Sequence, residues 1–162
     1  MTLRLLPALL IINASAVLPV AVTGQPHGLL PEDEQVLQVA EAALRAISAE
    51  DMVALTDLMV EGTVVWSVTE DGVVRRTRAE EREMRIAQDF VERGFDPEVR
   101  RTGNLATVWV PYDFHVNGAW SHCGVDTFTM VKVEGEWRIA GMAWTVEQPP
   151  ACRPHPEGPP GG

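Results

Sequence analysis

Residues able to do chemistry gather around one expected hairpin late in the chain. Strand-like residues flank Asn117-Gly118, a pair typical of a two-residue β-turn. With two residues in the turn, Asp113 pairs with His122, and directly opposed residues share one face of a sheet. Asp126 falls on the same face, four residues beyond His122. The pairing therefore predicts a cluster of two carboxyl groups and one imidazole.

This predicted cluster is suited to proton transfer. The ordinary pKa of histidine, about 6.5, is close to working pH, and a carboxylate opposite the ring orients it. A carboxyl group in an apolar pocket has a raised pKa and can exchange protons near neutrality. We expect Asp113 or Asp126 to be the base and His122 its partner or the acid. No cofactor is expected.

Large side chains are expected beside the cluster. The same register places Trp109, His115, Phe128 and Met130 on its face, and Trp66 on an earlier hairpin is predicted to line the pocket wall. An apolar pocket with a few convergent polar groups is typical of a small-molecule site. The expected ligand is therefore a small hydrophobic molecule that carries a carbonyl group.

Other interpretations of the cluster stay open. The site can bind a ligand without converting it, or the ionisable residues can be a solvated structural pair that leaves only a dimer-assembly role. A metal site is disfavoured, because the His and Asp residues lack a compact ligand spacing. The sequence contains neither a serine nucleophile elbow nor a Gly-rich phosphate loop.

The opposite face of the same strands is expected to carry too many large apolar side chains for a solvated surface. Apolar patches of that size usually bind a partner, so we expect a homodimer through this face. Its predicted residues are Val108, Val110, Tyr112, Phe114, Val125, Met142 and Trp144. A single β-bulge would exchange the two faces along part of a strand.

The elements that position these residues can be read from periodicity. Apolar residues at helical spacing predict two helices over 31–47 and 48–59. β-Branched residues predict a hairpin over 62–77, and a Thr-x-x-Glu capping box then predicts a third helix that runs to about 94. From 98 to 146, strand follows strand.

Two motifs in the last strands resemble a known superfamily. Residues 104–110 (Asn-Leu-Ala-Thr-Val-Trp-Val) resemble one of its strands, and residues 131–139 (Val-Lys-Val-Glu-Gly-Glu-Trp-Arg-Ile) resemble its closing hairpin. With the order of elements, residues 31–146 are similar to the nuclear transport factor 2-like superfamily, which includes SnoaL-like proteins and ketosteroid isomerases. The resemblance implies an α+β fold, in which a cone-shaped, curved antiparallel sheet packs against three N-terminal helices. Isomerase, cyclase or dehydratase chemistry is implied as an option.

Both ends of the chain are predicted to lie outside this domain, which we place at 29–147. Residues 1–24 have the layout of a secretory signal peptide, with an uncleaved membrane anchor as the alternative. We therefore expect export to the periplasm or the medium and no stable anchor. Residues 148–162 are rich in Pro and Gly and are expected to be disordered. In an exported chain Cys123 and Cys152 can form a disulfide, although two free thiols are the alternative.

The overall composition fits one globular domain. Of the 162 residues, 46% are hydrophobic and 22% are charged, which is ordinary for a folded chain. The net charge of −10 repels phosphate backbones, so nucleic acid is not an expected partner.

Overall fold

The computed structural model describes residues 31–85 and 87–160, so the predicted signal peptide lies outside the described residues. The helices are α1 (Pro31–Ser48), α2 (Met52–Asp57) and α3 (Arg78–Glu83). The strands are β1 (Met59–Thr69), β2 (Gly72–Thr77), β3 (Phe90–Gly94), β4 (Glu98–Thr102), β5 (Leu105–Val116), β6 (Ala119–Val133) and β7 (Glu136–Thr145). No helix within these ranges is long and apolar enough to cross a membrane.

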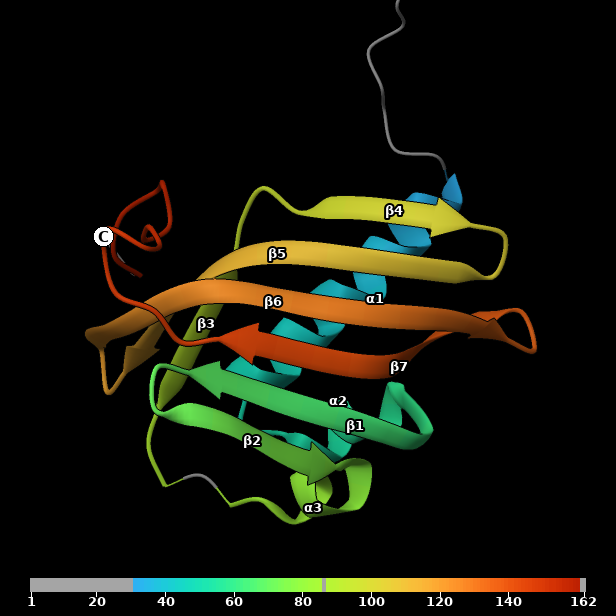
Figure 1. Ribbon diagram of the computed structural model, residues 1–162, viewed down its shortest axis with the longest axis horizontal. Helices are drawn as coiled ribbons and strands as arrows, with labels where there is room; N and C mark the ends of the chain where they lie inside the picture. Colours follow the sequence, from blue (N-terminus) through green and yellow to red (C-terminus); the bar gives the residue numbers. More distant parts are fainter. Residues whose placement is uncertain (1–30, 86, 161–162) are drawn as a thin grey trace, which may run out of the picture.

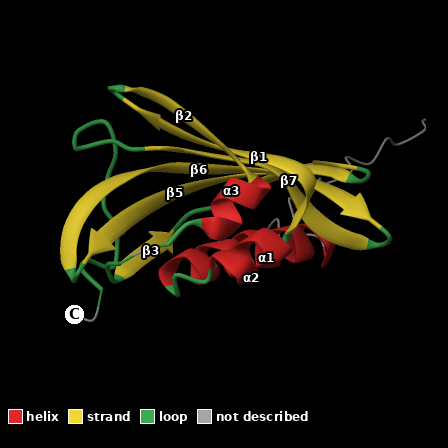
Figure 2. Ribbon diagram, turned by 90° about the horizontal axis from the view of Figure 1, so that it is seen from below, coloured by secondary structure: helices red, strands yellow, loops and turns green. Residues whose placement is uncertain are grey.

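The strands form one curved sheet in the order β2-β1-β7-β6-β5-β3, and β4 also pairs with β5 (Figure 1). The helices lie together on its concave side (Figure 2). The predicted α+β architecture is therefore confirmed. The expectation of a purely antiparallel sheet is wrong, because β1 runs parallel to β7. The parallel direction follows from the position of α2, because the helix ends beside β7. There the backbone N–H of Ile139 donates a hydrogen bond to Leu58 O at 2.9 Å.

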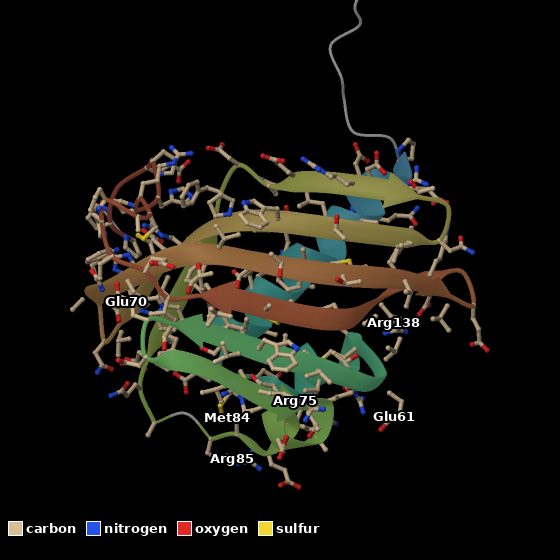
Figure 3. All side chains as sticks on the ribbon, viewed as in Figure 1. Glu61, Glu70, Arg75, Met84, Arg85 and Arg138 are labelled. Carbon is tan, nitrogen blue, oxygen red and sulfur yellow. A yellow bond between two sulfur atoms is a disulfide. The ribbon has the colours of Figure 1, made fainter. Side chains whose placement is uncertain are left out.

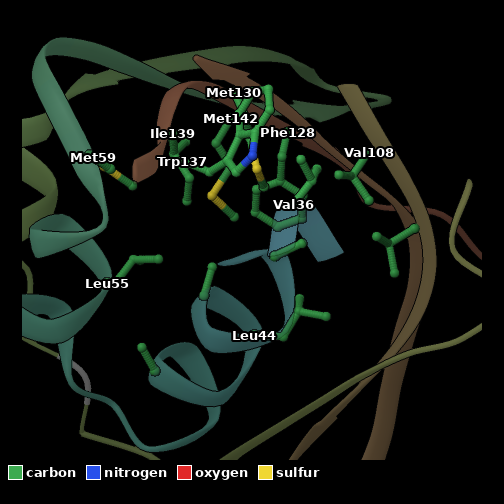
Figure 4. Packing of buried hydrophobic residues seen from close by; sticks show 14 of the residues in the cluster. Val36, Leu44, Leu55, Met59, Val108, Phe128, Met130, Trp137, Ile139 and Met142 are labelled. Carbon is green, nitrogen blue, oxygen red and sulfur yellow. The ribbon is translucent and has the colours of Figure 1, made fainter. Parts of the chain in front are cut away.

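The core lies between α1, α2 and the concave side of the sheet. Val36, Ala40 and Ala43 of α1 repeat at helical spacing and are fully buried. They pack on side chains from β5, β6 and β7 in one continuous cluster (Figure 4). Burial of each Val- or Leu-sized side chain stabilises the fold by about 1.5–3 kcal/mol. This core cluster fixes the strands whose other end carries the polar residues.

The third helix is shorter than predicted. The capping box between Thr77 and Glu80 is present, but α3 ends at Glu83. Residues 90–94, which we assigned to this helix, form β3 instead. They make five successive pairs with β5, from Phe90 with Val116 to Gly94 with Tyr112. Strand pairing along the edge of the sheet thus outweighs the weak helical pattern of the segment.

The hairpin at Asn117-Gly118 forms as predicted, but its register shifts two residues from the turn. Val116 pairs with Ala119 and His115 with Trp120, after which Ser121 is left unpaired as a bulge. Beyond the bulge, Asp113 pairs with Cys123 rather than with His122. One extra residue exchanges the faces of one strand relative to the other, so most side chains of β5 point the opposite way from our prediction.

The predicted dimer face is therefore wrong. Val108, Val110 and Tyr112 are at most 2% exposed and lie on the concave side. A second bulge, at Ala140, turns Met142 and Trp144 to the same side. Homodimer formation stays a prediction without a defined surface.

The C-terminal segment lies beside the bent end of the sheet, at the left in Figure 1, and contacts outward-facing residues of β5 and β6. The predicted disulfide between Cys123 and Cys152 is present. Beyond it, Arg153 pairs with Asp96 at 2.7 Å, and the backbone N–H of His155 donates to Asp113 Oδ2 at 3.0 Å. The stretch from 148 to 160, which we expected to be disordered, thus has a defined path.

Candidate active site

A cavity lies between the helices and the bent end of the sheet. Its volume is about 150 Å³, and engineered cavities of about 150 Å³ bind benzene, so one six-membered ring fits. The apolar walls come from Ile47, Met52, Leu55, Met84, Phe90, Phe114, Met142, Trp144 and Val146. The polar or ionisable groups are Arg76, Glu81, Glu92, Tyr112, His122 and Asp126.

Two carboxyl groups share the inner end of this cavity. Asp126 of β6 is completely buried, and no hydrogen bond of normal length and angle from the described residues reaches either of its oxygens. Glu92 of β3 is its neighbour. Burial raises the pKa of Glu92 to about 7, although its interaction with Asp126 counteracts part of that rise. Burial, and then the charge of Glu92, raise the pKa of Asp126 well above its ordinary value. The pair therefore retains a proton at neutral pH.

The backbone of Glu92 is fixed from α1. Ser48 Oγ accepts a hydrogen bond from Glu92 N at 2.9 Å and donates to Glu92 O at 3.2 Å. Since β3 is the edge strand on this side, these two groups have no partner strand. The serine takes the place of the missing strand and holds the glutamate toward the cavity.

His122 lies in the same wall of the cavity as Glu92, and the ring of Phe114 lies between them. Glu92 pairs with Phe114, and Phe114 pairs with His122. The His122 ring stacks on Phe114 with centroids 4.7 Å apart, and its Nδ1 lies 3.0 Å from Ser121 Oγ. Burial lowers the pKa of His122, so the ring is neutral at pH 7.

An ion pair forms the opposite wall. Arg76 Nε donates to the buried carboxylate of Glu81 at 2.6 Å, and the guanidinium carbon lies 5.5 Å from the centre of the Trp144 ring. Arg76 comes from β2 and Glu81 from α3, so the pair links the first hairpin to the helices. Its charges compensate each other, so among the described residues that line the cavity no unpaired cation faces the two carboxyls.

Tyr112 has a structural role in the wall. Its hydroxyl group donates a hydrogen bond to Thr145 O at 2.6 Å, so the hydroxyl proton is already used within the protein. Burial, followed by the charges of Asp126 and Glu92, raises its pKa further. The close approach requires Gly124 on the neighbouring strand, because a Cβ there would lie 2.2 Å from Thr145 O.

The structure brings together only two of the three predicted catalytic residues. His122 and Asp126 line the cavity. Asp113 does not, because the bulge at Ser121 turns it to the outer side, where it bonds Arg93.

None of the five predicted ligand-binding residues lines the cavity. Trp66 and Trp109 are 41% and 52% exposed on the outer side of the sheet. The guanidinium group of Arg75 lies 6.0 Å from the centre of the Trp66 ring (Figure 3). Phe128 and Met130 belong to the core beneath α1 (Figure 4). His115 is buried next to Asp113.

Sequence reasoning missed Glu92, Arg76 and Glu81. Glu92 fell inside the segment we predicted as helix, and the two others lie in the charge-rich run 75–85, a pattern typical of a solvated helix face. The only local signal was the Thr77–Glu80 capping box, which starts the helix that carries Glu81. In the described ranges, no group of three His, Cys, Asp or Glu residues is arranged to hold a metal ion.

Neither the family models nor the curated proteins give a match to this sequence. Solved structures do match in three dimensions. A protein of unknown function with a cystatin-like fold from Nostoc punctiforme gives a TM-score of 0.62 at 12% identity, over 76% of this chain and 98% of that one. An NTF2-like protein of unknown function from Pseudomonas putida gives 0.62 at 12% identity, over 76% and 93%.

A third match is named as a candidate scytalone dehydratase. It comes from Novosphingobium aromaticivorans and gives a TM-score of 0.59 at 13% identity, over 72% of this chain and 85% of the other. At these identities the likeness concerns the fold alone. The chain therefore has the nuclear transport factor 2-like, or cystatin-like, fold that its closing strands resemble.

Proposed function

We propose that the cavity binds a ring-sized, mainly apolar molecule with a carbonyl group, and that Glu92 and Asp126 move protons on it without a cofactor. The observation that carries the proposal is the Asp126 carboxyl, which is completely buried beside the Glu92 carboxyl and receives no hydrogen bond of normal length and angle from the part of the chain that the structure describes. Buried polar groups are nearly always hydrogen-bonded, and an uncompensated buried acid is costly for the fold. A bound substrate oxygen or hydroxyl would supply the missing partner.

The two acids suit different tasks. With a pKa of about 7, Glu92 is partly ionised at neutral pH and suits the general base. Asp126 keeps its proton more strongly, and it can donate a hydrogen bond to a carbonyl oxygen. Removal of the α-proton by Glu92 would then give an enolate whose oxygen accepts the hydrogen bond from Asp126. Return of that proton from Glu92 to a different carbon of a conjugated enolate gives an isomer. In a β-hydroxy ketone, Glu92 instead gives the proton to the leaving β-hydroxyl, which departs as water and leaves the dehydrated product.

The surrounding walls support this division. His122 is neutral and stacked on Phe114, so it does not neutralise either acid. Several aromatic and aliphatic side chains surround the two acids in the cavity. In such surroundings a carboxylate base is poorly solvated and more reactive. The name of the Novosphingobium protein is compatible with dehydratase chemistry in this fold.

The test uses cyclohexanone, a single ring with one carbonyl group. Exchange of its α-protons for deuterium in D₂O is followed by proton NMR with wild-type protein and with Glu92→Gln. We expect the wild type to accelerate exchange, and the variant to lose about 10²–10⁴-fold of that acceleration, which is the usual contribution of a general base. Glu98→Gln, which alters an exposed glutamate on β4, is the matched control and should keep the wild-type rate.

Binding is measured in the same samples by the chemical-shift changes of the protein. If cyclohexanone binds but exchanges equally fast with wild type and Glu92→Gln, the cavity is a binding site without this chemistry. If it neither binds nor exchanges, the proposed ligand class is wrong.

Export is part of the proposal. Residues 1–24 have the pattern of a signal peptide, and a disulfide such as Cys123–Cys152 persists mainly in oxidising compartments. N-terminal sequencing of protein recovered from the periplasm or the medium tests this, and an intact N-terminus on cytoplasmic protein would contradict it.

A further inference from the structure

A second row of side chains lies directly behind the cavity wall. The wall row is Glu92, Phe114 and His122, which pair across β3, β5 and β6. The outer row is Arg93, Asp113 and Cys123, which pair across the same strands one residue along. Because successive side chains of a strand point to opposite faces, each outer side chain is anchored on the backbone that carries a wall side chain.

Contacts with one another and with the C-terminal segment hold this outer row. Arg93 donates two hydrogen bonds to the buried carboxylate of Asp113, at 3.0 and 2.6 Å. The backbone N–H of His155 donates to the same carboxylate at 3.0 Å. Cys123 is covalently bonded to Cys152, three residues before His155. The segment from 152 to 155 therefore holds β5 and β6 directly from outside, and it is linked to β3 through the Arg93–Asp113 pair.

The strand that carries Glu92 packs on α1 but has only one support within the sheet. β3 has five residues and a single neighbouring strand, β5. Short edge strands open locally more readily than central ones. Ser48 fixes the Glu92 backbone on the open edge, and the Arg93–Asp113 pair fixes the next residue. Glu92 stays in the cavity only while β3 stays paired.

We propose that Asp113 is a positioning residue, and that the disulfide-bonded segment 152–155 acts through it to hold Glu92 against Asp126 in the cavity. The inference rests on the proposed function for the role of Glu92, but the mechanical link does not depend on turnover. It also gives the Asp113 carboxyl, which we first expected to be catalytic, a role on the other side of the same wall.

The charges around Asp113 fit this role. Burial on its own raises the pKa of Asp113, but the hydrogen bonds from Arg93, the His155 backbone and His115 together lower it. Asp113 is therefore ionised at neutral pH and accepts all of these bonds. On the cavity side, the ionisable groups from the other elements around Glu92 are Asp126 and His122 of β6, Tyr112 of β5, Arg76 of β2 and Glu81 of α3.

A matched pair of variants isolates the clamp. His155→Ala removes the imidazole but keeps the backbone N–H, whereas His155→Pro also removes the N–H that binds Asp113. Both lose the edge contact of the His155 ring with Phe95. The readout is the titration midpoint of Glu92, measured by NMR of protein with carbon-13 in its glutamate carboxyl groups, together with amide hydrogen exchange of residues 90–94.

We expect His155→Ala to match the wild type. In His155→Pro, water reaches Glu92 more easily, so its midpoint should fall by about one pKa unit, a tenfold loss of proton affinity. Amide exchange in β3 should become faster. Equal Glu92 midpoints and equal amide exchange in the two variants would overturn the proposal. Segment 152–155 would then pack on the sheet without any effect on Glu92.

If His155→Pro does not fold, the wild type with its disulfide reduced and the Asp113→Asn variant are read in the same way, and unchanged values in both overturn the proposal. The outcome is separable from the proposed function. Deuterium exchange of the ketone can fail while the Glu92 midpoint still differs between the two His155 variants. It can also succeed while that midpoint is the same in both.

Discussion

Removing the carboxyl group of Glu92 should stabilise the protein, and only at the higher end of the pH range. In Glu92→Gln an amide of the same shape replaces an acid that burial disfavours in its charged form. The difference between the ordinary pKa of 4.5 and about 7, at about 1.4 kcal/mol per pKa unit, corresponds to about 3 kcal/mol. This is the upper end of the expected gain, because the Asp126 carboxyl remains in place.

The sign follows from proton binding. Between pH 4.5 and about 7 the folded wild type holds a proton on Glu92 that the unfolded chain has lost. Wild-type stability therefore falls as pH rises through this window, whereas the variant has no such group to titrate. Below the window the two proteins should have similar stability, and above it the variant should keep its full advantage.

The assay is urea unfolding at pH 4.5 and pH 8.5, with the disulfide intact. Glu98→Gln is the control, since it also replaces a glutamate but on an exposed part of β4. It should change the free energy of unfolding by less than about 0.5 kcal/mol at either pH. The reasoning is refuted if Glu92→Gln gives the same difference from wild type at both pH values, or if it destabilises the protein at pH 8.5.

Three further predictions concern the wall of the cavity. Gly124→Ala should lower the free energy of unfolding in urea by about 3 kcal/mol or more, because its Cβ would lie 2.2 Å from Thr145 O. Gly141→Ala is the control, since its Cβ would meet its nearest atom only at 3.8 Å. Equal losses of stability in the two variants would contradict this. Tyr112→Phe should cost about 1 kcal/mol by removing the 2.6 Å hydrogen bond to Thr145 O, and unchanged stability would show that the bond contributes nothing. His122 should titrate below its ordinary pKa of 6.5 because it is buried, and an NMR midpoint at or above that value would place the ring in solvent.

Local patterns predicted the fold because its main signals are short-range. The apolar spacing of residues 31–47 predicts α1 and its buried face. The Asn117-Gly118 and Glu134-Gly135 pairs predict turns that join β5 to β6 and β6 to β7 with two residues each. All four of these turn residues have the positive φ that such turns need.

The site depended on features with no local signal. The bulges at Ser121 and Ala140 add one residue each, and nothing in their neighbours marks them. Because strand faces alternate, one unmarked residue at each bulge was enough. Ser121 moved Asp113 out of the cavity, and Ala140 moved Trp144 into it. Glu92 depended on whether residues 90–94 pair with β5, which a distant part of the chain decides.

The parallel contact between β1 and β7 affects how the protein is made. β1 starts at residue 59, and its partner residues in β7 run from 139 to 145. The first hairpin therefore cannot join the rest of the sheet until the last strand has left the ribosome. Contacts this distant in sequence slow folding. A nascent chain that stops before residue 136 would lack the central strand, so we expect it to remain unfolded and sensitive to proteolysis until synthesis is complete.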